Sequence, residues 1–236
     1  MIKQVFIGGH FSSGTRVVQF LLKQFYNIGT TKSEEDDGTL DYEVGFIEKD
    51  NTFTDKVLRG ERPELGIVKE PFSLKNPDFM LAVPYLKELF PDSKFILVVR
   101  NGLDQILCNN RRMSERYLDQ INLIETDFLK REMEYWNKIY KKAIDDGGVD
   151  LIVRLEDLVY NTKREVKKIV KLLGISYPDT SMIKVPNSMK RYKKSHIVHT
   201  ENSAEYPQGR DFVYDPSMRQ ELCEVGREMM KYFNYL

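Results

Sequence analysis

Three absences narrow the class of protein before any motif is considered. The 236 residues contain two cysteines, Cys108 and Cys223, too few for the disulfide framework of a small secreted domain, so we expect free thiols and a cytoplasmic location. Basic and acidic side chains number 36 each, and this zero net charge gives no general attraction to nucleic acid. No stretch approaches the ~18 apolar residues of a membrane span, and the first residues lack the apolar core of a signal peptide. Any anion-binding site must therefore be local.

Short apolar runs alternate with helical patterns along the chain. Phe95 to Val99 is apolar at every position, which is typical of a strand covered on both faces. We predict strands at 4–9, 66–69, 94–100 and 150–155, and helices at 15–26, 79–90, 104–117, along the apolar stripe from Phe128 to Ala143, from Asn161 or Thr162 to Gly174, and at about 216–233. This alternation predicts an α/β fold of three layers with a central, mostly parallel sheet, in a single domain over residues 1–236.

The first predicted strand leads into a glycine-rich turn, residues 9–16, with the sequence Gly-His-Phe-Ser-Ser-Gly-Thr-Arg. Backbone N–H groups in such a turn, followed by the start of a helix, favour an anion. A magnesium triphosphate site needs Lys and then Ser or Thr after the second glycine, where this chain has Thr15 and Arg16. The turn therefore suits a phosphate-like group but not magnesium triphosphate; the alternative is a tight turn with small residues for packing.

Five segments along the chain resemble one known family. Ser13 to Arg16, after a strand, is similar to the 5′-phosphosulfate loop of the sulfotransferases that use 3′-phosphoadenosine 5′-phosphosulfate (PAPS). Further similar segments are the Lys-Glu-Pro stretch of many bacterial members at 66–71, the 3′-phosphate motif at 94–104, a strand and helix block at 153–159 with 172–175, and the C-terminal ending at 232–235. The resemblance implies a P-loop-like sulfotransferase fold and transfer of a sulfuryl group from PAPS to a hydroxyl or amine. It also implies adenosine 3′,5′-bisphosphate (PAP) as product, and no metal.

The resemblance further implies two anion sites for one nucleotide. The 5′-phosphosulfate would be surrounded by the loop residues Ser12, Ser13, Gly14, Thr15 and Arg16. The family's 3′-phosphate contacts are an arginine, here Arg100, a serine eight residues later, here Cys108, and a late basic loop, here Lys190 and Arg191. A guanidinium at the carboxyl end of a central strand can grip phosphate with two hydrogen bonds. The alternative for Arg100 is an ion pair with Asp104. Cys108 could instead be a buried structural residue, and the basic residues Lys190 and Arg191 could form a solvated surface.

The chemistry requires a cation and a base. Ser12 stands where many members carry a lysine, so another positive group should meet the charge that develops on the leaving phosphate, and Arg16 and Lys69 are the candidates. We expect Lys69 at the end of the second strand, which should neighbour the first. The alternative is that Lys69 is a solvated surface lysine without a role in the reaction.

The acceptor must lose its proton to a base within hydrogen-bond reach. The family uses histidine or glutamate; Glu70 is our first candidate and His10 the second. Glu43 is a further candidate, and His196 and His199 could instead close over the acceptor. The alternative for Glu70 is an ion pair with a neighbouring lysine, and the alternative for His10 is an exposed loop histidine without a role in the reaction.

The identity of the acceptor is not written in these motifs. It is a small molecule, carbohydrate or peptide, and we expect its pocket to come from the regions 29–55 and 177–214. Leu155 stands where the family often has a tyrosine on adenine. We expect Glu156 and Asp157 to cap and brace the turn that follows them, and Trp136 to anchor the core. Two rival functions remain open: a magnesium-dependent nucleotide or small-molecule kinase, and a non-catalytic nucleotide-binding protein.

Overall fold

A four-stranded parallel sheet forms the centre of the computed structural model, which describes residues 4–25, 56–62, 72–75, 77–108, 126–176 and 216–236. The strands are β1 (Gln4–Gly8), β2 (Phe72–Lys75), β3 (Lys94–Val99) and β4 (Leu151–Arg154). They pair in the order β2-β1-β3-β4, and each pairing is parallel. The predicted α/β fold with a mostly parallel sheet is therefore confirmed.

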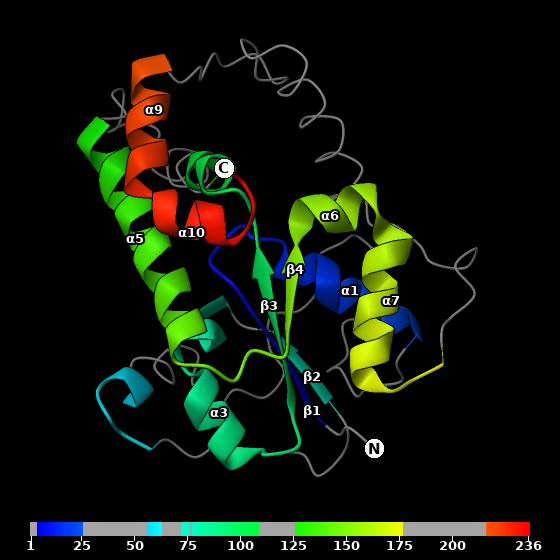
Figure 1. Ribbon diagram of the computed structural model, residues 1–236. Coiled ribbons are helices and arrows are strands. Elements are labelled where there is room, and N and C mark those ends of the chain that lie inside the picture. The colour runs from blue at the N-terminus through cyan, green and yellow to red at the C-terminus, as the bar shows by residue number, and fades with distance from the viewer. Residues whose placement is uncertain (1–3, 26–55, 63–71, 76, 109–125, 177–215) are drawn as a thin grey trace, which may run out of the picture.

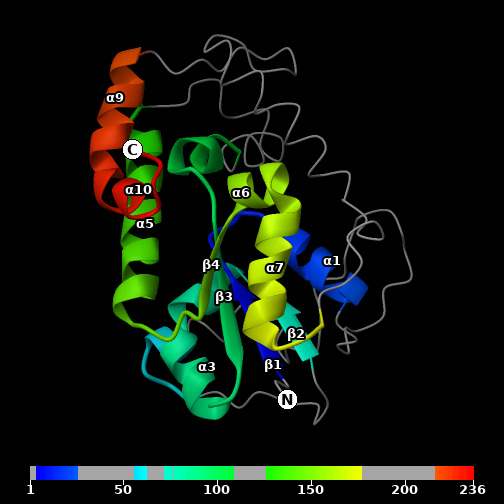
Figure 2. The ribbon, with the colours of Figure 1, turned by 45° about the vertical axis from the view of Figure 1, so that its right-hand side comes forward.

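Helices cover both faces of this sheet, as the two views of Figures 1 and 2 show. On one side lie α1 (Thr15–Phe25), α6 (Leu155–Tyr160) and α7 (Thr162–Leu173). On the other side lie η1 (Pro77–Leu81), α3 (Val83–Leu89), α5 (Thr126–Asp145), α9 (Pro216–Val225) and α10 (Arg227–Tyr232). The predicted three layers are confirmed. Within the described ranges, no helix combines the length and the apolarity needed to cross a membrane.

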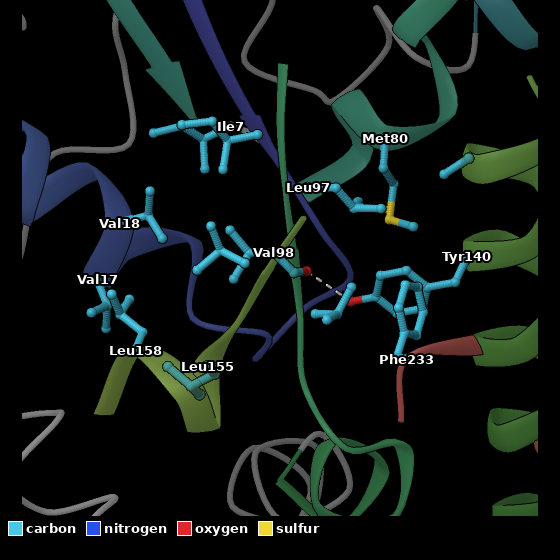
Figure 3. Close-up of a cluster of buried hydrophobic side chains, with 14 of the residues drawn as sticks. Ile7, Val17, Val18, Met80, Leu97, Val98, Tyr140, Leu155, Leu158 and Phe233 are labelled. Carbon is cyan, nitrogen blue, oxygen red and sulfur yellow. Dashed lines mark hydrogen bonds between the residues drawn. The ribbon is translucent and has the colours of Figure 1, made fainter. Parts of the chain in front are cut away.

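The core lies on both sides of β3. Residues 95–99 are at most 1% exposed, as the unbroken apolar run predicts. Figure 3 shows Leu97 directed toward Met80 and Tyr140, whereas Val98 faces Val18 on the opposite side of the strand. Full burial of one such side chain contributes about 1.5–3 kcal/mol, so this strand is a main source of stability.

All four strands end at the same edge of the sheet. The register pairs Ile7 with both Lys75 and Ile96, and Val99 with Arg154, so β1 and β2 end together and β3 and β4 continue two to three residues further. Ligands of α/β sheets bind outside this edge. The segments that follow β1, β2 and β3 are therefore where a ligand is expected.

The second strand differs from its predicted position. The strand that pairs with β1 is Phe72–Lys75, directly after Pro71, whereas the predicted strand 66–69 lies outside the described residues. Proline is tolerated at the start of a strand and on edge strands, and β2 is one of the two outer strands of the described sheet. Lys75 thus occupies the strand end that the sequence analysis expected for Lys69.

Two predicted helices are each divided in two. The helix expected at 79–90 is the 3₁₀ helix η1 followed by α3, with Pro84 in the first turn of α3. The helix expected at 216–233 is divided at Gly226 into α9 and α10. A short helix that was not predicted, α6, follows β4 directly. Pro84 explains the first division, because proline is tolerated in the first turn of a helix but not in its interior.

The remaining helices agree with their predictions. The α5 stripe is buried at Met133, Trp136, Tyr140 and Ala143. Gly174 ends α7 in the left-handed conformation (φ 60°), which favours glycine. The helix predicted at 104–117 begins at 102 and is described as far as 108.

Candidate functional site

The glycine-rich loop runs from the end of β1 to the start of α1 and passes close over β3. A Cβ atom at Gly9 would lie 2.2 Å from the backbone oxygen of Val98, nearer than any side chain could approach, and φ at Gly9 is 152°. The Gly9 N–H donates to the carbonyl of Pro77 (3.1 Å). Gly9 is therefore required by close packing, independently of any ligand.

The loop itself has the backbone geometry of an anion site. Ser12 and Gly14 both have positive φ (67° and 100°), and left-handed residues of this kind are found in anion-binding turns. The Ser13 N–H donates to the carbonyl of His10 (3.0 Å). Ser12 Oγ is buried, and no hydrogen-bond partner for it occurs in the described part of the chain. A buried hydroxyl left in this way costs about 1–3 kcal/mol, so a ligand oxygen would be a favourable partner.

Arg100 is the residue immediately after β3, and it contacts this loop. Its side chain is 8% exposed, and Nη1 donates to the carbonyl of Ser12 (3.3 Å). The structure thus brings together the two segments for which the sequence analysis predicted separate phosphate contacts.

The segment after Arg100 is braced from a distant part of the chain. Asn101 begins the helical segment 102–108, and its Oδ1 accepts from the N–H of Leu103 (3.0 Å). The Asn101 N–H donates to Glu156 Oε1 (2.9 Å), and Tyr235 donates through its hydroxyl to Glu156 Oε2 (2.7 Å). Glu156 was expected to brace the turn that follows it, whereas it braces the distant turn after β3.

His10 lies inside the protein, behind the loop. It is 7% exposed, and its Nδ1 is 3.0 Å from Gln105 Nε2. Burial lowers the pKa of His10 to about 4, and a hydrogen bond with the backbone of Phe11 offsets part of that effect. The backbone N–H of His10 donates to the hydroxyl of Tyr140 (3.2 Å), which in turn donates to the carbonyl of Val98 (3.0 Å; Figure 3).

Gln105 is a site residue that the sequence analysis missed. It is fully buried, donates through Nε2 to the carbonyl of Phe11 (2.6 Å), and accepts through Oε1 from Nε1 of Trp136 (2.9 Å). A glutamine within a helical pattern gives no sign of burial, because its partners come from the loop and from α5. Trp136 is buried as predicted, but it also has this polar contact.

Lys75 is the second residue that was missed. It stands at the carboxyl end of β2, the strand beside β1, and it is only partly exposed. The pKa of Lys75 is lowered to about 8, first by burial and secondly by the charge of Arg16, while the charge of Asp78 opposes this effect. Arg16 and Lys75 are therefore close enough to repel each other at this edge of the sheet.

Of the remaining candidates, only Cys108 lies within the described residues. Cys108, at the end of the described helical segment, and Cys223 are both partly buried and form no disulfide, as predicted. The following candidates lie outside the described residues: Glu43, Lys69, Glu70, Lys190, Arg191, His196 and His199.

Comparison with known proteins identifies the family of the chain. The model of the family described as "Sulfotransferase family" matches residues 29–179, more than half of the chain. Protein-tyrosine sulfotransferase 2 of Gallus gallus is 32% identical over 117 residues, which cover 48% of this chain and 29% of that protein. The match thus covers less than a third of that relative's length.

Solved structures share the fold. Sulfotransferase STF9 from Mycobacterium avium aligns with a TM-score of 0.55 and 14% identity over 98% of this chain and 76% of that chain. Mouse sulfotransferase SULT7A1 complexed with PAP aligns with a TM-score of 0.53 and 18% identity over 97% of this chain and 85% of that chain. The predicted sulfotransferase fold is confirmed, and on the family match the chain belongs to the sulfotransferase family.

Proposed function

We propose that this protein transfers the sulfuryl group of PAPS to a hydroxyl or amine of an acceptor. The observation that carries the proposal is the hydrogen bond from Arg100 to the carbonyl of Ser12. It joins an arginine suited to one phosphate to a loop suited to another, at the edge of the sheet where α/β proteins bind nucleotides. Membership of the sulfotransferase family supports this type of reaction.

Each anion site takes one end of the nucleotide. The 5′-phosphosulfate lies against Ser12, Ser13, Gly14, Thr15 and Arg16, and the buried Ser12 hydroxyl gains a partner there. Arg100 holds the 3′-phosphate, at the start of the helical segment that leads to Cys108. Lys190 and Arg191 close over the same phosphate.

A pair of cations replaces the loop lysine. Ser12 carries no charge, so the leaving phosphate needs another positive group. Arg16 and Lys75 are neighbours whose mutual repulsion an anion between them would relieve, and this supports the pair. Lys69 is the alternative partner from the Lys-Glu-Pro segment.

Glu70 is the proposed general base. The acceptor oxygen or nitrogen forms a bond to sulfur while the bond from sulfur to the 5′-phosphate oxygen breaks. The acceptor proton passes to Glu70, and the electron pair of the broken bond leaves with the phosphate of PAP. His10 is less suited to this step, because it is buried and its Nδ1 is in contact with Gln105.

A phenolic acceptor is favoured. Phe11 and Tyr135 are 50% and 47% exposed, and their rings lie 6.2 and 5.7 Å from the ring of His10. Large exposed aromatic side chains beside a site suit an aromatic ligand. The relative in Gallus gallus is named a protein-tyrosine sulfotransferase, so a tyrosine-containing peptide is the first acceptor to test. The free thiols support a cytoplasmic location.

Thermal stabilisation by nucleotides tests this function. PAP and magnesium ATP are compared at equal concentrations. A ligand that binds the folded protein raises its free energy of unfolding by RT ln(1 + [L]/Kd), and the Tm rises with it. We expect PAP to stabilise the protein, and PAPS with a tyrosine peptide to yield sulfated peptide. Stabilisation by magnesium ATP but not PAP would indicate a kinase. Binding of PAP without transfer to phenols, sugars, alcohols or amines would indicate a non-catalytic nucleotide-binding protein.

A further inference from the structure

Gln105 has an orientation that its neighbours determine. The indole N–H of Trp136 can only donate a hydrogen bond, so the Gln105 atom that faces it at 2.9 Å is the oxygen. Both hydrogens of Nε2 are then directed to the other side. One is donated to the carbonyl of Phe11 (2.6 Å) and the other to His10 Nδ1 (3.0 Å). His10 Nδ1 is therefore an acceptor, and the neutral ring carries its proton on Nε2.

These contacts determine how the loop presents its N–H groups. Carbonyls of three successive residues are held by donors: His10 by the N–H of Ser13, Phe11 by Gln105, and Ser12 by Arg100. A peptide unit is planar, with its C=O and N–H pointing in opposite directions. Holding the Phe11 carbonyl toward Gln105 thus directs the N–H of Ser12 to the opposite side of the loop.

Gln105 and Arg100 act on adjacent loop residues from one short segment. Arg100 ends the strand, and Gln105 lies in the helical segment 102–108, where its own N–H donates to the carbonyl of Asn101 (2.9 Å). Any shift of this segment therefore moves the donors of both carbonyls together. A movement of Arg100, proposed to bind the 3′-phosphate, is therefore coupled to a movement of the loop proposed to bind the 5′-phosphosulfate.

We propose that Gln105 is a positioning residue, which holds the loop in its nucleotide-binding conformation before the nucleotide arrives. The identity of the nucleotide rests on the proposed function, but the holding of the loop does not. Gln105 touches neither substrate nor reacting atoms; it acts through Phe11 and His10. A preorganised loop avoids the cost of ordering its backbone on binding.

Gln105→Glu is the sharpest variant, because the two side chains have the same shape. The carboxylate still accepts from Trp136, but it offers no hydrogen to Phe11 or His10. Asn137→Leu is the matched control. Asn137, on α5, also carries an amide, and its hydrogen bond is partly buried, but its Oδ1 accepts from the N–H of Met229, away from the loop (3.1 Å). Trp136→Phe is the second variant, used where Gln105→Glu fails to fold, because it removes the donor that orients the amide.

Three measurements are made on each variant. They are the Kd for PAP by calorimetry, hydrogen exchange of the peptide that covers residues 9–16, and the His10 tautomer from ¹⁵N chemical shifts, assigned by loss of the signal in His10→Gln. For Gln105→Glu we expect a Kd roughly tenfold weaker, faster exchange in the loop, and transfer of the ring proton to Nδ1. For Asn137→Leu we expect a lower Tm but a Kd within about twofold of the unmodified protein.

Two results would overturn the proposal. One is unchanged loop exchange and an unchanged His10 tautomer in Gln105→Glu or Trp136→Phe. The other is a loss of PAP affinity in Asn137→Leu equal to that in the Gln105 variant, which would make the effect one of general stability. If the unmodified protein binds no PAP, the proposed function fails, while loop exchange and the tautomer still decide whether Gln105 positions the loop.

Discussion

Arg100 is the side chain whose loss should weaken nucleotide binding most. It is buried, it follows the central strand, and it already contacts the loop. Removing a charged two-bond contact in Arg100→Ala should cost about 2–4 kcal/mol of binding free energy, a roughly 30- to 1,000-fold weaker Kd for PAP by calorimetry. Arg154→Ala is the control, because Arg154 ends the neighbouring strand but lies over the ring of Tyr235 (4.4 Å). Affinity within threefold of the unmodified protein for Arg100→Ala would exclude it from the site.

Lys75 should give the folded protein a distinctive pH dependence. Its pKa of about 8 in the folded state lies below the ordinary value of 10.5. Between these values the unfolded chain holds a proton that the folded chain has released, so stability rises as pH increases from about 8 to 10.5. Below pH 8 both states are protonated and the cost of burying the charge is fully present.

Lys75→Met tests this prediction, since it keeps the apolar stem and removes the titrating group. Urea unfolding of both proteins is measured from pH 7 to 10.5, and the difference between them isolates Lys75 from the tyrosines that ionise in the same range. We expect the variant to be more stable below pH 8 and its advantage to shrink above it. A constant difference across this range would show that Lys75 titrates normally.

At the scale of elements, Met133 of α5 is held between two glycines. A Cβ atom at Gly102 would lie 3.0 Å from Met133 Sδ, and one at Gly226, between α9 and α10, would lie 2.7 Å from it. The absence of side chains at these positions lets α5 pack closely against both neighbours. Backbone conformation does not require glycine at position 226, because φ there is −88°, a value that other residues adopt readily.

Gly226→Ala should therefore destabilise the protein mainly through Met133. The far end of a methionine can move, so we expect a loss of about 1 kcal/mol in the free energy of unfolding. In a Met133→Ala background, the same substitution should cost less, because only the replacement of glycine by alanine at the N-cap of α10 remains. Urea unfolding of the four proteins of this cycle measures the coupling. Equal effects in both backgrounds would mean that the two residues do not interact.

Elements could be predicted where their signal is local. Phe95–Val99 is apolar at every position, and β3 was found almost to the residue. The strand beside β1 was not identified, because short runs on both sides of Pro71 are equally compatible with a strand and only pairing with β1 distinguishes them. The break at Gly226 could not be foreseen, since it depends on how α9 and α10 pack against α5.

For the whole molecule, one contact ties the C-terminal segment to the centre of the sheet. Glu156 is buried and accepts from the Asn101 N–H with one oxygen and from the Tyr235 hydroxyl with the other. Burial, and secondly the charge of Glu156, raise the pKa of Tyr235, so its hydroxyl remains a donor. Three distant parts of the chain thus meet at one carboxylate.

Tyr235→Phe should break this contact. A buried carboxylate left with one donor fewer is costly, and we expect a loss of about 1–3 kcal/mol in the free energy of unfolding, seen as a lower urea midpoint. Tyr232→Phe, at a side chain that is 53% exposed, should change the midpoint little. Equal midpoints for Tyr235→Phe and the unmodified protein would show that water replaces the hydroxyl.

The candidate site could be predicted from the sequence only where its residues lie in contiguous motifs. The loop and Arg100 lie in contiguous motifs, so their residues were identified directly. Gln105, by contrast, is a site residue only because an indole about thirty positions later orients it. Lys75 was missed because the strand that it ends was not identified. Long-range pairing of polar groups leaves no local pattern in the chain.

The hydrogen bond from Trp136 to Gln105 has a practical consequence. Trp136 is the single tryptophan of the chain, and it is fully buried. Its fluorescence emission therefore arises from one indole whose N–H is bonded to the amide behind the loop. Any rearrangement of that amide alters the polarity around the excited ring, so the protein carries an intrinsic optical reporter of its own loop and needs no added dye.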